Sequence, residues 1–425
     1  MKKRNYFKVL ILAITTVFFF SCNSTDDDGT ENGNGSGNEP QVTSISIQAN
    51  ATTIDLGGTI SFTVKDNNNV IVSVQSTIYF DGSEISGFVH TPESVGVFQV
   101  HATYEGFTAQ SINITVNEPP RVVYASSDSY TKLLGEGFTF TALTNGGENI
   151  TSEAVFYIDG AEISGNEYTP AGRGRHALTA LYDGVTSDEV FVTIGYVQKV
   201  LVEDYTGAWC GYCPRLAYNL EEAENGDINV IGVAIHNGDA MAYEYEANLR
   251  AEYNVNGFPS GRINRNITWN ESVSQISAYA AGVNGNLGLG LETSLSGSTI
   301  SVDVKVAYVN TVNNAKIVVY LTEDNLIYSQ VNYMNNNSSS PWYQAGNPIV
   351  NFVHNNVLRK TPTDIFGDAM PNAVDGDEYT DSFTFSVPAS VQNTDNLEIV
   401  AFIIGSNGTV INSQRVSLGD SQDYQ

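Results

Sequence analysis

The chain has 425 residues, of which 41% are hydrophobic, and its formal net charge is −28. This length predicts about three domains, each with a hydrophobic core. The large excess of acidic residues argues against binding to nucleic acid or to an anionic lipid surface, because both need basic patches. The five His residues are scattered without ligand-like spacing, and we expect neither a metal nor another cofactor.

Residues 1–22 are typical of a lipoprotein signal peptide. A basic start precedes the mostly apolar stretch 9–20, which is too short to span a bilayer of about 30 Å. Cys22, preceded by a small residue, resembles the modified Cys of a bacterial lipobox, although two Phe residues depart from the usual pattern. An ordinary secretory signal is the alternative. Residues 23–41 contain no apolar side chain to bury and are expected to form a disordered tether.

Residues 42–196 contain an internal duplication with an offset of 78 residues. Asp81-Gly82 recurs as Asp159-Gly160, and the tetrapeptide EISG recurs at the same offset without a gap. Alternating apolar and polar residues between Gly, Asp and Pro turns predict several short strands in each copy. The copies resemble bacterial immunoglobulin-like domains. We expect β-sandwiches over residues 42–118 and 119–196, acting as spacers or in adhesion.

From residue 197 the pattern changes to alternating strands and helices. We expect strands in 197–207, 228–236 and 260–265, and helices in 213–224, 239–253 and 270–283. Such alternation predicts a mainly parallel sheet over residues 197–284. Residues 285–425 return to strand periodicity and are expected to form a C-terminal β-sandwich with a long Asn- and Ser-rich loop at 332–348. The predicted fold class is multidomain, α/β plus all-β.

Cys210 and Cys213 are the remaining cysteines once Cys22 carries a lipid. They follow a predicted strand and open a predicted helix, where side chains three apart can meet in a disulfide. The start of a helix favours the thiolate form, so Cys210 would be the exposed nucleophile and Cys213 the resolving thiol. Structural zinc is one alternative, but a second ligand pair is missing. An inert cross-link is the other.

The stretch from Trp209 to Cys213 resembles a thioredoxin-fold active site. The resemblance implies a thioredoxin-like α/β domain over residues 197–284 and a buried Asp204 that accepts the proton of Cys213. The adjacent Glu203 leaves open which carboxylate faces the site. The segment YNVNGFPSGRIN resembles protein disulfide isomerases and implies a cis-proline against the disulfide, with a bulky Phe before it. The implied catalytic residues are Cys210, Cys213, Asp204, Pro259 and Trp209.

A narrower resemblance covers the chain from about Lys199 to its end. VLVEDYTGAWCGYCPR and the later FVHNNVLR resemble the twenty-eight-kilodalton outer-membrane-protein family of lipoproteins. That family joins a thioredoxin-like domain to a C-terminal β-domain. It implies a lipid-anchored location at the outer membrane, facing the periplasm or the cell surface. His354, together with Arg359, is a weaker candidate site, because a single His on a strand is more often structural.

Two functions follow from these observations. The first is a lipid-anchored thiol–disulfide exchange protein that acts on exported proteins with thiols or disulfides through its CGYC pair. The alternative is a surface binding or adhesion lipoprotein in which the thioredoxin-like domain is mainly a scaffold. Either would contact the membrane through its N-terminal lipid. The sequence identifies neither a redox partner nor the direction of electron flow.

Overall fold

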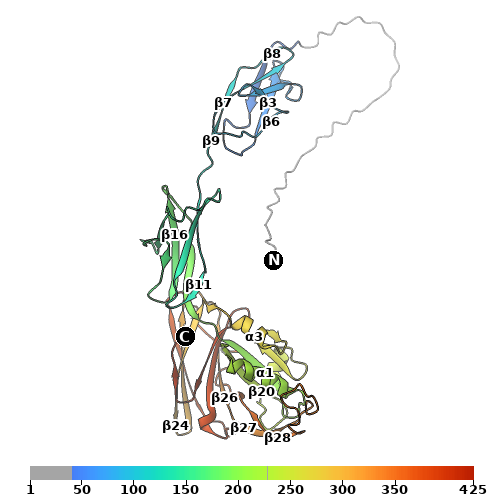
Figure 1. Ribbon diagram of the computed structural model, residues 1–425, viewed down its shortest axis with the longest axis vertical. Helices are drawn as coiled ribbons and strands as arrows, with labels where there is room; N and C mark the ends of the chain where they lie inside the picture. Colours follow the sequence, from blue (N-terminus) through green and yellow to red (C-terminus); the bar gives the residue numbers. More distant parts are fainter. Residues whose placement is uncertain (1–40, 227) are drawn as a thin grey trace, which may run out of the picture. The chain divides into compact units, whose positions relative to one another are not determined.

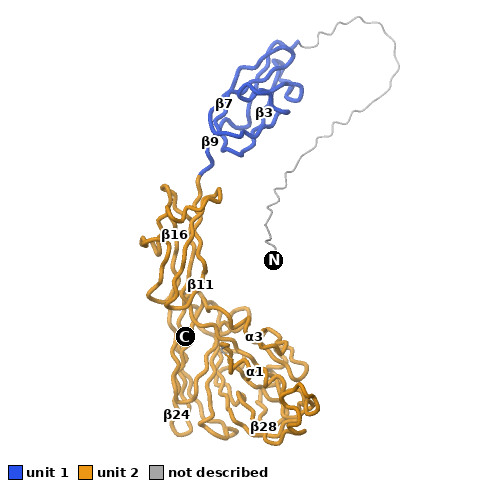
Figure 2. The backbone as a smooth tube through the Cα atoms, viewed as in Figure 1, with its two compact units in different colours: residues 1–120 blue, residues 121–425 orange. Residues whose placement is uncertain are grey.

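The computed structural model describes residues 41–226 and 228–425. The predicted signal peptide with Cys22, and the predicted tether up to residue 40, lie outside these residues. The described chain divides into two compact units, one ending at Pro120 and one spanning Arg121–Gln425 (Figure 2).

The first unit is an immunoglobulin-like β-sandwich of two sheets (Figure 1). One sheet has the order β1-β3-β6, formed by β1 (Ile45–Ala49), β3 (Ile60–Asp66) and β6 (Val89–His90). The other has the order β2-β9-β7-β4-β5 with β8 beside β7, formed by β2 (Thr53–Asp55), β9 (Ile112–Asn117), β7 (Gly96–Tyr104), β4 (Thr77–Phe80), β5 (Ser83–Glu84) and β8 (Phe107–Thr108). Alternate side chains such as Phe62 and Val100 fill the core between the sheets.

The second unit begins with the same sandwich, each strand starting 78 residues after its counterpart. Its small sheet contains β10 (Val123–Ser127), β12 (Phe138–Thr144) and β15 (Glu167–Tyr168). Its larger sheet contains β11 (Thr131–Leu133), β18 (Val190–Val197), β16 (Gly174–Tyr182), β13 (Val155–Ile158), β14 (Ala161–Glu162) and β17 (Val185–Thr186). β18 also pairs with β23 (Val283–Asn284), which joins this sandwich to the rest of the unit.

A nine-stranded mixed sheet organises the remainder of the second unit. Its order is β22-β21-β19-β20-β29-β26-β32-β33, with β30 beside β26. The strands are β22 (Ile267–Trp269), β21 (Ser260–Ile263), β19 (Val200–Thr206), β20 (Val230–His236), β29 (Val357–Lys360), β26 (Lys316–Glu323), β32 (Leu397–Ile404), β33 (Val410–Ser417) and β30 (Asp368–Ala369). β20 is parallel to both its neighbours, and the other pairs are antiparallel.

Both faces of this sheet are covered, which explains why β26 and β32 are almost continuously apolar. Ile317 and Val319 face a four-stranded sheet, whereas Val318 and Tyr320 face the opposite core. The four-stranded sheet has the order β31-β25-β24-β34, with β31 (Glu378–Ser386), β25 (Thr299–Tyr308), β24 (Leu287–Ser296) and β34 (Ser421–Gln422).

The helices and one hairpin lie against the β19 half of the sheet. α1 (Cys213–Asn225) and α3 (Val273–Ala280) share a core with β19, and α2 (Glu246–Glu252) buries Leu249 in the core on the other side. The hairpin consists of β27 (Leu326–Gln330) and β28 (Ile349–His354). A 3-10 turn, η1 (Thr394–Asn396), precedes β32.

The predicted fold class is wrong in its α/β part. Among the described residues strands make up 47% and helices 8%, with three α-helices, so this part of the chain is almost entirely β and shows no evident thioredoxin-like α/β domain. The sheet through residues 197–284 continues into β29, β26, β32 and β33, and it is mixed rather than mainly parallel. Local periodicity does not reveal that β20 pairs with a strand more than 120 residues later, as Ala234 does with Val357.

The predicted helix over residues 239–253 is also wrong for most of its length. Only Glu246–Glu252 is helical, and its single fully buried side chain is Leu249. The preceding residues form turns, in which the side chain of Asp239 accepts the backbone N–H of Met241. An Asp side chain that bonds nearby N–H groups favours a turn over a helix, which accounts for the shortened element.

Candidate functional site

The cysteine pair lies where β19 passes into α1. A turn after Thr206 carries Cys210, and Cys213 is the first residue of α1, followed by Pro214 in the first turn. Cys210 and Cys213 form a disulfide with an S–S distance of 2.04 Å. The first-turn proline is compatible with this position because the N–H that it lacks would have no helical partner.

The disulfide is buried, with 5% of Cys210 and 1% of Cys213 exposed. It is covered by residues 330–348, which we call the cap segment. Gln330 Nε2 donates to the carbonyl of Cys210 at 2.8 Å, and the Tyr333 N–H donates to the carbonyl of Gly211 at 2.9 Å. The Tyr333 ring packs so closely on Gly211 that a Cβ added to Gly211 would lie 2.3 Å from the Cγ of Tyr333. The cap segment therefore covers the backbone of the cysteine loop.

The aromatic residues around the pair are exposed, in contrast to the sulfurs. Trp209 is 47% exposed and lies edge-to-face with Phe258 at 5.3 Å, and its Nε1 donates to the carbonyl of Asn237. Tyr212 is 49% exposed and meets Tyr333 edge-to-face at 5.2 Å. These side chains form an aromatic surface beside the buried disulfide.

Asp204 lies in β19, and Pro259 immediately precedes the neighbouring strand β21. The Phe258–Pro259 peptide bond is cis and directly precedes β21, whose Gly261 pairs with Asp204 of β19. Burial, together with the nearby Glu271 carboxylate, raises the pKa of Asp204 to about 8. Its Oδ1 atom is buried and has no hydrogen-bond partner within the described chain.

The two adjacent carboxylates face opposite sides of β19. Glu203 points into the core away from α1, where Arg265 Nε lies 3.3 Å from its Oε1 and the Tyr320 hydroxyl donates to the same atom at 3.0 Å. Asp204 instead shares a pocket with Cys213. The carboxylate on the side of the disulfide is therefore Asp204, as alternation along a strand requires.

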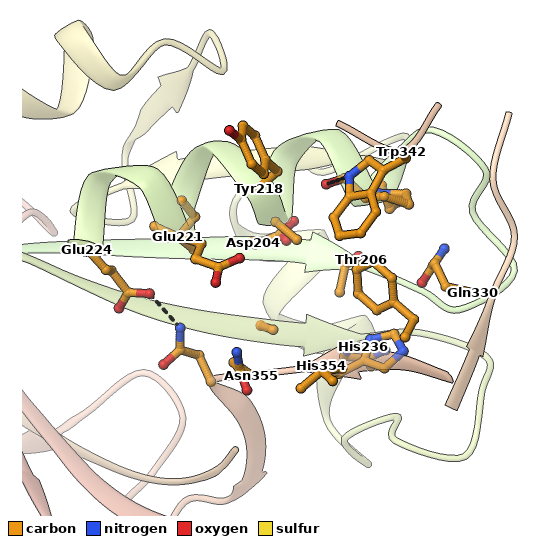
Figure 3. A pocket seen from close by; sticks show the side chains of 18 residues that line it. Asp204, Thr206, Tyr218, Glu221, Glu224, His236, Gln330, Trp342, His354 and Asn355 are labelled. Carbon is orange, nitrogen blue, oxygen red and sulfur yellow. Dashed lines mark hydrogen bonds between the residues drawn. The ribbon is translucent and has the colours of Figure 1, made fainter. Parts of the chain in front are cut away.

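A pocket of about 80 Å³ lies between α1, the ends of β19 and β20, and the β27–β28 hairpin with its cap segment (Figure 3). Asp204, Glu221, Trp342 and His354 are among its lining residues. Burial, and the charge of His236 at a ring distance of 5.1 Å, lower the pKa of His354 to about 4. His354 is thus a pocket residue.

The sequence did not reveal this pocket or the cover over the disulfide. The cap segment contains the Asn- and Ser-rich loop 332–348, whose Trp342 donates from Nε1 to the carbonyl of Pro214 at 3.1 Å. A Trp within a polar loop was the available signal. Arg359 is not part of the pocket, because its guanidinium pairs with Glu323 at 3.0 Å.

The structure thus brings Cys210, Cys213 and Asp204 together, with Trp209 and Pro259 on adjoining segments; their catalytic roles stay predictions. Across residues 41–226 and 228–425 no cluster of three or more His, Cys, Asp or Glu side chains is arranged to hold a metal ion. Within the same residues no helix is both long and apolar enough to cross a membrane.

Residues 246–422 match the family model described as "Outer membrane protein Omp28". The resemblance to the twenty-eight-kilodalton outer-membrane-protein family is confirmed over these residues, which begin after the cysteine pair rather than at Lys199. The match indicates a protein of the outer membrane or the cell surface. No curated protein matches the chain.

Three solved structures are among those to which parts of the chain are similar. HBP35 of Porphyromonas gingivalis is 18% identical with a TM-score of 0.42, and the match covers 52% of this chain and 76% of that one. Three N-terminal domains of the bacteriophage RB49 outer capsid protein Hoc are 9% identical with a TM-score of 0.24, and the match covers 88% of this chain and 98% of that one. The Yersinia pseudotuberculosis adhesin InvE is 16% identical with a TM-score of 0.15, and the match covers 36% of this chain and 59% of that one. With TM-scores below 0.5, none of these likenesses defines the function or fold of this chain.

Proposed function

We propose that the protein is a lipid-anchored binding protein of the outer-membrane surface, and that its single described disulfide is a structural cross-link. The observation that carries this proposal is the burial of both cysteine residues, together with the hydrogen bonds from the cap segment to the backbone of their loop. The family match supports the location. The lipobox-like sequence at Cys22, which lies outside the described residues, supports the lipid anchor.

The cover on the cysteine loop opposes thiol–disulfide exchange. Exchange requires a thiolate to reach a disulfide sulfur, so its rate depends on access. Here the carbonyls of Ala208, Cys210 and Gly211 already accept hydrogen bonds from the cap segment. An incoming chain would have to displace these bonds and the Tyr333 ring before it could contact the pair.

The exposed surfaces suit binding better than chemistry. Trp209, Tyr212 and Tyr333 present large aromatic surface, and aromatic side chains are enriched where proteins bind partners. The two immunoglobulin-like sandwiches add further β surface. A tether after a lipidated Cys22 would hold this body away from the membrane.

Thiol–disulfide exchange is the second candidate, favoured by the unpartnered Asp204 carboxyl in the pocket with Cys213. A buried carboxyl with a raised pKa is suited to taking the proton of a resolving thiol. This function would require the cap segment to open. Its partners would be exported proteins with thiols or disulfides and a redox partner.

Reduction kinetics separate the two candidates. The full-length protein is exposed to dithiothreitol, and free thiols are trapped with a maleimide over time, once natively and once in urea. We expect native reduction to be at least 100-fold slower than reduction of the unfolded chain, because access requires opening of the cap segment. Tyr333→Ala should speed native reduction at least tenfold, and Tyr343→Ala, an exposed residue of the same segment, less than twofold.

Reduction of the native protein at the rate of the unfolded chain, together with turnover of insulin disulfides, would instead establish the exchange function.

Binding is tested by the adhesion of cells that carry the protein to polystyrene coated with serum proteins. Labelling of the protein by a membrane-impermeant biotin reagent reports whether it is exposed on the cell surface. Cys22→Ala should abolish both signals, and the Cys210→Ser/Cys213→Ser variant should retain both. Loss of adhesion by a folded, surface-exposed double-Ser variant would contradict the proposal.

A further inference from the structure

The pocket beneath α1 contains polar atoms that the protein leaves unsatisfied. Asp204 Oδ1 and His354 Nε2 are both buried and have no hydrogen-bond partner among the described residues. A buried polar atom without a partner is costly, so a site that retains two of them is suited to a ligand that satisfies both.

Both of these atoms accept hydrogen bonds when they meet a donor. Burial lowers the pKa of His354 to about 4, so its ring is neutral near neutral pH, and Nε2 accepts a hydrogen bond in the tautomer that carries the proton on Nδ1. An ionised Asp204 carboxylate is likewise an acceptor only. The exposed Glu221 of α1 adds a second carboxylate to the lining (Figure 3).

The pocket is rich in carboxyl groups, and its lining residue His236 is already paired with Asp239 at 2.7 Å. Its lining residues, all from the described chain, include Asp204, Glu221 and Glu224 but no Lys or Arg. The nearby cations are engaged elsewhere: Arg215 lies 2.5 Å from Glu271, and Arg415 lies 2.9 Å from Glu224. Only Glu224 thereby gains a positive partner, and the other two carboxylates stay without one.

An aromatic wall completes the pocket. Tyr218 meets Trp342 edge-to-face at 6.5 Å, Trp342 meets Phe352 at 4.9 Å, and Phe352 meets His354 at 4.8 Å. Aromatic faces attract cations, and the attraction strengthens where water is displaced. Figure 3 shows Trp342 and Tyr218 on the side of the pocket formed by α1 and the cap segment.

We propose that this pocket binds a primary ammonium group, from either a free alkylamine or a Lys side chain of a peptide. An ammonium carries three donors and one positive charge, which match three groups of the pocket, the carboxylates of Asp204 and Glu221 and the Nε2 of His354, and the aromatic wall. The volume of about 80 Å³ would hold roughly five water molecules, or an ammonium with a short alkyl chain. The net charge of −28 attracts such cations to the protein.

This proposal is independent of the surface-binding function and of disulfide exchange. It also differs from a metal site, since no three His, Cys, Asp or Glu side chains converge on one point in the described chain. The aromatic lining favours an organic cation, because a metal ion makes no use of an apolar wall.

The test is titration of the full-length protein with n-butylammonium, followed by calorimetry and by tryptophan fluorescence, to which Trp342 of the pocket contributes, at about pH 8.5 so that Asp204 is mostly ionised. n-Butanol is the matched neutral ligand, and Nα-acetyl-lysine amide represents a peptide. We expect saturable binding of n-butylammonium and at least tenfold weaker binding of n-butanol. Tighter binding of the lysine derivative would assign a peptide ligand, and tighter binding of butylammonium a free amine.

Variants locate the site. Asp204→Asn should weaken binding at least tenfold, and Glu221→Gln, on the rim, about three- to fivefold. Glu222→Gln is the matched control: it is exposed on α1 one residue away, lies outside the pocket lining, and should change affinity less than twofold. The proposal would be overturned if n-butylammonium showed no saturable binding, or if n-butanol bound equally tightly. It would also be overturned if Zn²⁺ bound saturably in place of the amine, or if Glu221→Gln and Glu222→Gln lost affinity equally.

Discussion

The buried Asp204 gives the strongest quantitative prediction. Its carboxyl is 1% exposed, and its pKa is raised from 3.8 to about 8 by burial and by Glu271. The folded protein therefore keeps this proton at pH values where the unfolded chain has lost it. Stability from this group is complete below the unfolded pKa and is lost as the pH rises through the folded pKa. Asp204→Asn, which cannot ionise, should remove this dependence.

The expected magnitude follows from linkage. Each pH unit between the two pKa values costs the wild type about 1.4 kcal/mol relative to the Asn variant. Between about pH 5 and pH 7, both inside that interval, the stability difference between wild type and Asp204→Asn should change by about 2.7 kcal/mol. Other groups that titrate in this range are common to both proteins and cancel in the comparison.

The assay is urea denaturation monitored by tryptophan fluorescence at both pH values. The protein has three Trp residues, Trp209, Trp269 and Trp342, and all lie in the second unit near the site. Asp395→Asn, an exposed position before β32, is the matched control and should show no such change. A wild-type-to-variant difference that stays constant within about 0.5 kcal/mol would refute the reasoning, because Asp204 would then be ionised in the fold.

Three further predictions concern stability; the first two use the same denaturation assay, and the third combines it with hydrogen exchange. Cys210→Ser/Cys213→Ser should lower the free energy of unfolding by only about 2 kcal/mol, because the closed loop is four residues long; a loss above about 5 would contradict a simple cross-link. Arg265→Met should cost about 3–5 kcal/mol by leaving the buried Glu203 without its ion pair, and adding Glu203→Gln should restore part of it; absence of restoration would exclude the pairing. Phe62→Ala should lower the stability of the first unit, measured by hydrogen exchange, by about 3–5 kcal/mol. The urea transition monitored by Trp fluorescence should stay unchanged, because all three Trp residues lie in the second unit; a shift of that transition would show that the stabilities of the two units are coupled.

The immunoglobulin-like repeat could be read from the sequence because its signals are local. Strand alternation and turn residues act over a few positions, so an offset of 78 residues in sequence becomes the same offset in structure. At the tight turn of each copy, Asp81 and Gly82, like Asp159 and Gly160, take positive φ angles, which Asp and Gly tolerate. The disulfide-forming spacing of Cys210 and Cys213 is equally local.

The tertiary structure alone decided what surrounds that pair. The same strand and helix pattern that predicts a separate α/β domain is compatible with β20 pairing to β29, and only long-range pairing selects the nine-stranded sheet. Likewise, no local pattern places Gln330 on Cys210 or His354 in one pocket with Asp204. These contacts join residues more than 100 positions apart, and their stability comes from burial and hydrogen bonds that exist only once the chain has folded.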